Sequence, residues 1–362
     1  MAGGVLAVLL VVAAVTWQTL RPASDTDRTV RIDQLQSFGT HNSYHLPVSA
    51  RELRVARLVN PAAAQLGYGF PPLGDQLRAG LRVLELDIYP DPAGGLYSYP
   101  LIRRLTGLGR LPGMSEPGTK VLHIADVDYR STCPTFVGCL AQLRAFTVAD
   151  PRHTPVFVLL EFKTSDARLQ RLGGVTAPPW DAAALATVDA EITRELGGAV
   201  ITPDEVRKPG STLEESAVAG NWPTLAAARG RVLFAMVDSS GTARDAYRDG
   251  HPGLAGRQVF TDAEPGQSDA AFVRRDDPIR VDGPQIPGLV RRGYLVRTRA
   301  DDGPADPGRL AAARASGAQL VSTDHPDTLA AVVSAGPDGV LVGCNPVSAP
   351  PGCPAGVGRT AP

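Results

Sequence analysis

The chain has 362 residues, 43% of them hydrophobic, and its 36 basic and 37 acidic side chains give a formal net charge of -1. No block of like charge runs along the sequence, which argues against a nucleic-acid groove or a polybasic membrane patch and favours a folded protein with a small polar ligand. The 38 Gly and 32 Pro predict many loops rather than long helices.

Residues 1–27 are expected to form a signal peptide or a membrane anchor. The apolar run 5–17 is shorter than the roughly 20 residues that a membrane-spanning helix needs. It suits the hydrophobic part of a signal peptide, and the polar segment 22–27 follows it, although no Lys or Arg precedes it. The prediction is a secreted, extracellular protein, or one anchored to the outer face of the membrane.

The four cysteines form two local pairs, Cys133 with Cys139 and Cys344 with Cys353. Such pairs predict short disulfides, and the shorter loop would contribute roughly 2 to 3 kcal/mol. Disulfides persist in oxidising compartments, which agrees with export. The alternative is four free thiols in a cytosolic protein. Neither pair has the spacing of a zinc site.

Short apolar runs alternate with Ala-, Leu- and Arg-rich helical stretches along the chain. Gly80, Gly230 and Gly317 each stand just before such a run, where a glycine can take the left-handed turn that ends a helix. The predicted strands are 35–39, 81–88, 120–124, 156–162, 231–237, 258–261, 294–298 and 318–323. This alternation indicates an α/β protein.

Eight strands separated by helix-length segments predict a single (β/α)8 TIM-like barrel over residues 31–335. An open doubly wound sheet is the alternative, but no Gly-rich phosphate-binding sequence follows the first strand. The Gly- and Pro-rich residues 336–362, closed by the Cys344–Cys353 pair, are expected to form a C-terminal tail rather than a domain.

Polar side chains stand at the ends of the first four predicted strands. They are His41 and Asn42, Glu85 and Asp87, His123, and Glu161 and Lys163. Residues at i and i+2 share one face of a strand, so each carboxylate pair or ion pair can point inward while its apolar neighbours face the helices. Active sites of barrels assemble at the carboxyl ends of the strands.

Three carboxylates at one rim repel one another unless a cation lies between them. Glu85, Asp87 and Glu161, with the amide oxygen of Asn42, form an all-oxygen set that suits Ca²⁺ or Mg²⁺. Ca²⁺ is favoured over Mg²⁺ because the expected compartment is extracellular and the geometry need not be octahedral.

His41, His123 and Lys163 complete what cleavage of a phosphodiester requires, namely an acid, a base and a positive charge for the phosphate. Each feature has an ordinary structural explanation when taken alone. A His-Asn pair is common in turns, and Glu-x-Lys is usually a surface ion pair. Their conjunction at successive strand ends is what indicates a site.

Several segments resemble the calcium-dependent phosphoinositide-specific phospholipase C family of bacteria, within the phosphodiesterase superfamily of TIM barrels. They are FGTHNSYH, GLRVLELDIY, VLHIADVDYRSTCPTFVGCL, VFVLLEFKT, GYLVRTRAD and SGAQLVSTDHP. The resemblance runs from about residue 31 to residue 356.

The resemblance implies that Asn42, Glu85, Asp87 and Glu161 bind calcium and that His41 and His123 are the catalytic pair. It also implies attack of the inositol 2-hydroxyl on phosphorus, which gives a cyclic phosphate and releases diacylglycerol. Lys163 is expected to bind substrate, as are Arg297 and Arg299, two arginines that could equally brace the barrel by pairing with carboxylates.

Other residues have weaker expectations: pocket-lining positions are expected for His45, Asp126, Tyr129 and His325, and loop positions for His153 and His251. The expected partner is a phospholipid or another phosphodiester, with transient contact to a membrane surface, no nucleic acid, and a monomeric chain. Two other functions stay open: a glycerophosphodiester phosphodiesterase, and a catalytically inactive secreted module that binds lipid or carbohydrate. The first would carry Arg after its first His, where this chain has Asn42.

Overall fold

The computed structural model describes residues 23–59, 61–237, 241–327, 341–354 and 356–357. The predicted apolar run 5–17 therefore lies outside the described residues. The α-helices are α2 (Asp25–Thr29), α3 (Ala50–Val59), α4 (Leu73–Arg78), α5 (Leu101–Leu105), α6 (Phe136–Ala149), α7 (Ala167–Arg171), α8 (Ala182–Leu196), α9 (Pro203–Val206), α10 (Leu213–Val218), α11 (Leu225–Ala228), α12 (Thr242–Arg248), α13 (Ile286–Arg291) and α14 (Pro307–Ser316). The 3-10 helices are η1 (Ile32–Gln34), η2 (Pro61–Gly67), η3 (Gly197–Ala199) and η4 (Pro252–Leu254).

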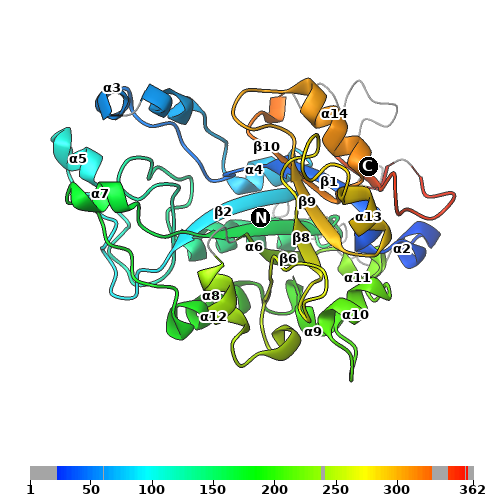
Figure 1. Cartoon of the computed structure of the whole chain (residues 1–362). Coiled ribbons are helices and arrows are strands. Elements are labelled where there is room, and N and C mark those ends of the chain that lie inside the picture. Colours follow the sequence, from blue (N-terminus) through cyan, green and yellow to red (C-terminus); the bar gives the residue numbers. More distant parts are fainter. Residues whose placement is uncertain (1–22, 60, 238–240, 328–340, 355, 358–362) are drawn as a thin grey trace, which may run out of the picture.

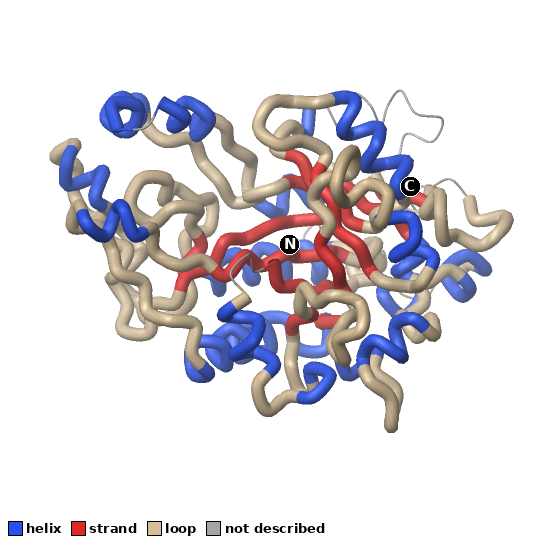
Figure 2. Tube along the Cα trace, in the orientation of Figure 1, coloured by secondary structure: helices blue, strands red, loops and turns tan. Residues whose placement is uncertain are grey.

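The strands form one curled, mostly parallel sheet at the centre of the molecule (Figures 1 and 2). They are β1 (Leu35–Thr40), β2 (Val83–Tyr89), β3 (Lys120–Val121), β4 (Val156–Phe162), β5 (Val200–Ile201), β6 (Val232–Val237), β7 (Val259–Phe260), β8 (Phe272–Arg274), β9 (Leu295–Arg299), β10 (Leu320–Thr323) and β11 (Val342–Cys344). The parallel order is β7-β6-β4-β2-β1-β10-β9-β8, and a single bridge between Asp262 and Phe272 links the two ends. The expected TIM-like α/β class is confirmed.

One predicted barrel strand, 120–124, is wrong. Within this segment the named strand is β3, Lys120–Val121, which pairs antiparallel with the end of β2, with Val121 opposite Ile88. The chain between them holds only the five-residue helix α5, which is too short to cover the barrel in a crossover, so the chain turns back along β2 instead. The eighth position is taken by β8, whose three residues leave little apolar pattern in the sequence.

The sheet core follows the alternation of side chains along each strand. In β2, Leu84, Leu86 and Ile88 join the main hydrophobic cluster on the outer face, so Glu85 and Asp87 face inward. β1 and β2 meet at one pair, Gly39 with Val83. A Cβ at Gly39 would lie 1.7 Å from the Val83 carbonyl oxygen, so only glycine permits this approach.

The C-terminal segment returns to the barrel. β11 pairs antiparallel with the start of β1, with Cys344 opposite Leu35. Both predicted disulfides, Cys133–Cys139 and Cys344–Cys353, are present. Among the helices of the described ranges, none is long and apolar enough to span a bilayer.

Candidate active site

Three carboxylates converge inside the barrel at the carboxyl ends of two neighbouring strands. Glu85 and Asp87 come from β2, and Glu161 comes from β4, where it stands opposite Asp87 in the parallel register. One oxygen from each lies within 4.8 Å of the others. Burial and the charge of Asp87 raise the pKa of Glu161, as expected for carboxylic acids crowded together.

Buried oxygen atoms without hydrogen-bond partners surround this cluster. Asp87 Oδ1 and the amide Oδ1 of Asn42 are buried and accept no hydrogen bond, and the partner of Asp87 Oδ2 is the Lys163 ammonium. Asn42 has a positive φ of 49°, a conformation that asparagine tolerates better than most residues. Unsatisfied buried acceptors are costly, and a hard divalent cation is the partner that carboxylate and amide oxygens prefer. The donor set therefore fits calcium.

Two basic side chains hold the carboxylates. Lys163 Nζ lies 3.1 Å from Asp87 Oδ2 and 3.3 Å from Glu161 Oε1. Burial opposes protonation, but Asp87 and Glu161 prevail and raise the pKa of Lys163 well above its ordinary value. Arg297, which is 2% exposed, donates to Glu85 Oε2 at 2.8 Å and also to Asp276. The guanidinium of Arg297 thus fixes the carboxylate of Glu85, a predicted metal ligand.

His41, which follows β1, is flanked by two carboxylates. Its Nδ1 lies 2.8 Å from Asp324 Oδ1, and its Nε2 lies 3.4 Å from Glu85 Oε1. Burial opposes the positive charge, but Glu85 and Asp324 raise the pKa of His41 above its ordinary value. Arg299 completes the group by pairing with Asp324 Oδ2 at 2.9 Å.

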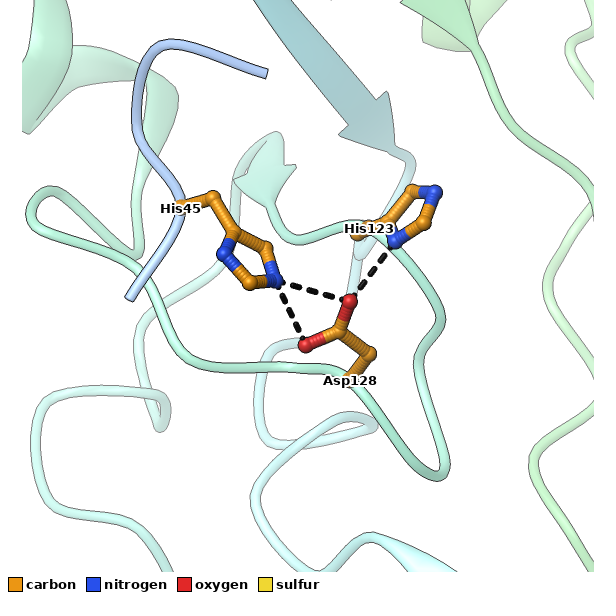
Figure 3. A group of neighbouring side chains, drawn as sticks. All are labelled: His45, His123 and Asp128. Carbon is orange, nitrogen blue, oxygen red and sulfur yellow. Dashed lines mark hydrogen bonds and ion pairs between the residues drawn. The ribbon is translucent and has the colours of Figure 1, made fainter. Parts of the chain in front are cut away.

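His123 belongs to a second histidine–carboxylate group, drawn in Figure 3. Its Nδ1 lies 2.7 Å from Asp128 Oδ2, and His45 Nε2 lies 2.8 Å from both oxygens of the same carboxylate. Burial opposes ionisation, but the hydrogen bonds from both imidazoles hold the pKa of Asp128 below its ordinary value. An ionised Asp128 only accepts, so Nδ1 of His123 carries a proton and Nε2 is free.

Figure 3 shows the two rings on opposite sides of the Asp128 carboxylate. The nitrogen and oxygen atoms of these three residues also lie within 4.8 Å of one another, as metal ligands would. These residues already form hydrogen bonds to one another, however, so we interpret the group as a hydrogen-bonded chain and not as a metal site. β3 brings His123 here because the Leu122 N–H donates to the Asp87 carbonyl at 3.1 Å.

A cavity of about 320 Å³ opens beside these groups. His123, Glu161 and Lys163 line it, together with Tyr89 and Asp126. A phosphate-bearing ligand in this cavity would meet one ammonium group, one imidazole and the edge of the acidic cluster.

The structure brings together most of the residues that the sequence singled out. Predicted site residues that meet around the cluster are His41, Asn42, Glu85, Asp87, Glu161, Lys163 and Arg297. His123 lines the same cavity as Glu161 and Lys163, and Arg299 is linked to His41 through Asp324. His45 does not line the pocket, because it is buried behind His123 with 0% exposure.

The sequence did not single out Asp128 or Tyr68. Asp128 lies two residues after Asp126 in a loop, where one acidic residue looks like another. Tyr68 follows the 3-10 helix η2 and lies far from Asn42 in the sequence. The fold brings the two together, and Asn42 Nδ2 donates to the Tyr68 hydroxyl at 3.0 Å.

Comparisons with known proteins agree with this geometry. A family model described as phosphoinositide phospholipase C, Ca2+-dependent, matches residues 30–346. A calcium-dependent phosphoinositol-specific phospholipase C from a Pseudomonas species is similar in structure, with a TM-score of 0.56 and 14% identity, over 89% of this chain and 97% of that one.

A Ca2+-dependent phosphatidylinositol-specific phospholipase C from Streptomyces antibioticus has a TM-score of 0.54 and 19% identity, over 83% of this chain and 98% of that one. At these identities the structural likeness shows the fold. No curated protein matches the sequence.

Proposed function

Because the chain belongs to the Ca2+-dependent phosphoinositide phospholipase C family, we propose that it cleaves phosphatidylinositol into diacylglycerol and a cyclic inositol phosphate. Members of this family are phosphodiesterases of the phospholipase C type, and calcium is their cofactor. The observation that carries the proposal is the acidic cluster with unpartnered buried oxygens, flanked by two histidines that each donate to a carboxylate.

In this proposal Asn42, Glu85, Asp87 and Glu161 hold the calcium ion. When bound, the ion would lower the pKa of the inositol 2-hydroxyl and neutralise charge on the phosphate. Lys163 binds a non-bridging phosphate oxygen from the wall of the cavity.

His41 and His123 are the proton-transfer residues. The 2-hydroxyl oxygen forms a bond to phosphorus while the bond from phosphorus to the glycerol oxygen breaks. One proton leaves the hydroxyl and one arrives at the glycerol oxygen, so one base and one acid suffice. Nε2 is the atom of each ring that can serve, since Nδ1 donates to Asp324 in one ring and to Asp128 in the other.

Arg297 and Arg299 support the site from within in this proposal. Arg297 fixes Glu85 and Arg299 fixes Asp324, so both act through other residues. Arg299 keeps some exposure, with 17% of its side chain accessible, and a direct contact with the phosphate or an inositol hydroxyl stays a prediction for it.

A membrane surface is the proposed partner of α3 and α5, the two helices that pack together and gather with α7 at the left of Figure 1. Arg51, Arg54 and Arg57 project from α3 and form no ion pair with any described residue. Leu58 on α3 and Leu105 on α5 are 86% and 62% exposed. Exposed cationic and apolar side chains together suit an anionic lipid surface.

From the sequence, residues 44–76, with Leu58 among their apolar side chains, allow either a helix that covers the barrel, which is favoured, or a lid or lipid-facing helix. The pairing of this stretch with α5 is not visible along the chain, because some forty residues separate the arginines from α5. We further propose that the protein is exported, with residues 1–27 as signal or anchor, and acts as a monomer. The two disulfides support export because they persist outside the reducing cytosol.

The test is release of cyclic inositol phosphate from phosphatidylinositol by the purified protein, with calcium, magnesium or chelator present. We expect product with calcium, less with magnesium and none with chelator, and loss of turnover in His41→Ala and His123→Ala. Absence of calcium-dependent product would overturn the proposal. Parallel assays with a soluble glycerophosphodiester separate it from the alternative phosphodiesterase activity.

A further inference from the structure

We propose that His45 and Tyr68, two stacked residues outside the predicted catalytic set, position both arms of the site: His45 orients His123 through Asp128, and Tyr68 orients the amide of Asn42. This inference rests on the proposed function for the roles of His123 and Asn42. Both residues act through others, so they are positioning residues and not catalytic ones.

His45 is fixed at both ring nitrogens. Nε2 faces the two oxygens of Asp128 at 2.8 Å, and Nδ1 faces the carbonyl oxygen of Tyr68 at 3.0 Å. Both neighbours are hydrogen-bond acceptors, so each ring nitrogen faces an oxygen and neither is open to another partner. The side chain is completely buried, which keeps it from substrate.

His45 therefore limits how the Asp128 carboxylate can rotate. The carboxylate bonds to two side chains, His45 and His123. Because His45 fixes the plane of the carboxylate, Oδ2 lies 2.7 Å from Nδ1 of His123. With Nδ1 donating to Oδ2, the free Nε2 of His123 is directed to the cavity that it lines. Without His45, the carboxylate would keep a single partner and could turn, and the ring of His123 would turn with it.

Tyr68 performs the corresponding task for the metal arm. Asn42 Nδ2 donates to the Tyr68 hydroxyl at 3.0 Å, which leaves Oδ1 as the unpartnered buried atom on the other side of the amide. An amide can present either its oxygen or its nitrogen, and only the oxygen can bind a cation. While the Tyr68 hydroxyl accepts from Nδ2, the amide is held with its oxygen free, which is the orientation that suits calcium.

The two residues form one unit. Their rings stack with centroids 4.2 Å apart and planes 13° apart, and the backbone N–H of His45 donates to the carbonyl of Asn42 at 2.9 Å. A single turn and one aromatic pair thus hold both the ligand of the ion and the support of the acid–base residue. Supporting hydrogen bonds of this kind are typically worth about 10- to 100-fold in activity or metal affinity.

The His45 arm is tested with His45→Phe, which keeps a ring for stacking but cannot donate, and His45→Gln, whose amide nitrogen can reach the place of Nε2. We expect His45→Phe to lower kcat about 10- to 100-fold with KM and calcium affinity within about twofold of wild type. His45→Gln should recover part of kcat. His153→Gln, a buried histidine in the loop before β4, is the control and should keep kcat.

Equal kcat in His45→Phe and wild type would overturn this arm. So would equal losses in His45→Phe and His45→Gln, or a parallel loss of kcat and calcium affinity, because a merely structural role would produce them.

The Tyr68 arm is tested by titrating the purified protein with calcium chloride in a calorimeter, which needs no turnover. Tyr68→Phe should weaken the calcium Kd about 10-fold relative to wild type. Tyr294→Phe is the matched control, because the Tyr294 hydroxyl bonds Glu214 and Arg292 just before β9, away from the acidic cluster, and its loss should leave Kd unchanged.

An unchanged Kd in Tyr68→Phe overturns this arm, as does an equal weakening in both tyrosine variants. If the wild type itself binds no calcium, the metal arm and the proposed function fall together. If the wild type binds calcium and turns over substrate, a failure belongs to the inference alone.

Discussion

At the scale of single residues, the site depends on hydrogen bonds that fix each imidazole. Asp324 accepts from His41 Nδ1, and burial opposes its ionisation while His41 and Arg299 hold its pKa below the ordinary value. It therefore stays a carboxylate through the neutral range and keeps the proton on Nδ1, with Nε2 directed inward.

We expect Asp324→Asn to lower kcat at least about 100-fold, because asparagine carries no charge and can present an N–H to Nδ1. KM should change little. Steady-state kinetics at saturating calcium measure both constants, and Asp302→Asn, a substitution at an exposed neighbour, is the control. A kcat within threefold of wild type would contradict the role of Asp324.

Residues that carry the site were predictable when strand alternation placed them. Glu85, Asp87 and Glu161 alternate with apolar residues in buried strands, so their inward direction could be read from spacing alone. Asp128 and Tyr68 lie in loops, where no periodicity says which way a side chain points, and their partners are distant in sequence.

At the scale of elements, the joint between β1 and β2 sets the geometry of the site. Gly39 lies against the Val83 carbonyl at the only paired position of these strands, just before His41 and Asn42. Any side chain there separates the strand that carries Asn42 from the strand that carries Glu85.

Gly39→Ala should therefore destabilise the protein by several kcal/mol, through overpacking against backbone that cannot move aside. Thermal unfolding followed by circular dichroism would show a much lower Tm, or the protein would not accumulate in soluble form. Gly288→Ala is the matched control, because a Cβ at that position in α13 meets nothing within 4 Å. Equal Tm values for the two variants would refute the argument.

The platform of α3 and α5 makes a separable prediction. Replacing Leu58 and Leu105 by Ser, or Arg54 and Arg57 by Glu, should reduce sedimentation with vesicles that contain phosphatidylglycerol. The Ser variants would bury less apolar surface in the lipid. The Glu variants would lose roughly 1 kcal/mol of electrostatic attraction to the anionic surface for each arginine replaced.

Cleavage of a short-chain, monomeric phosphatidylinositol should stay near wild type in these variants, since the platform lies outside the acidic cluster. Vesicles of phosphatidylcholine alone test the charge component. Unchanged binding of all variants to the anionic vesicles would show that another surface meets the lipid.

At the scale of the whole molecule, one buried histidine makes stability depend on pH. Burial lowers the pKa of His153 to about 4, against an ordinary value of 6.5. His153 binds a proton less readily in the folded state than in the unfolded chain. Its contribution to the free energy of unfolding is therefore complete above about pH 6.5 and is lost as the pH falls toward 4. A pKa difference of this size between the folded and unfolded states corresponds to about 3 kcal/mol of folding stability.

We expect His153→Gln to flatten the fall in Tm between pH 6.5 and 4 relative to wild type. Other ionisable groups act equally in both proteins, so the difference between their two pH profiles isolates this residue. Parallel profiles would mean that His153 is already charged in the folded protein.

The fold itself was predictable to the level of the barrel, and its errors have identifiable causes. Long apolar runs such as β2 and β4 were placed within a few residues. The wrong assignment at 120–124 arose because a short antiparallel strand and a barrel strand look alike when both are apolar, and β8 was missed because three residues show no period. β11 was missed because its pairing with β1 spans nearly the whole chain.

That last pairing has a consequence for synthesis. β1 leaves the ribosome about 300 residues before β11, the strand that covers Leu35, Gln36 and Ser37. Until then these three residues present open backbone groups that any other extended peptide could bind. A nascent or prematurely terminated chain would expose this edge of β1. We therefore expect a chaperone to protect the edge until β11 has been synthesised.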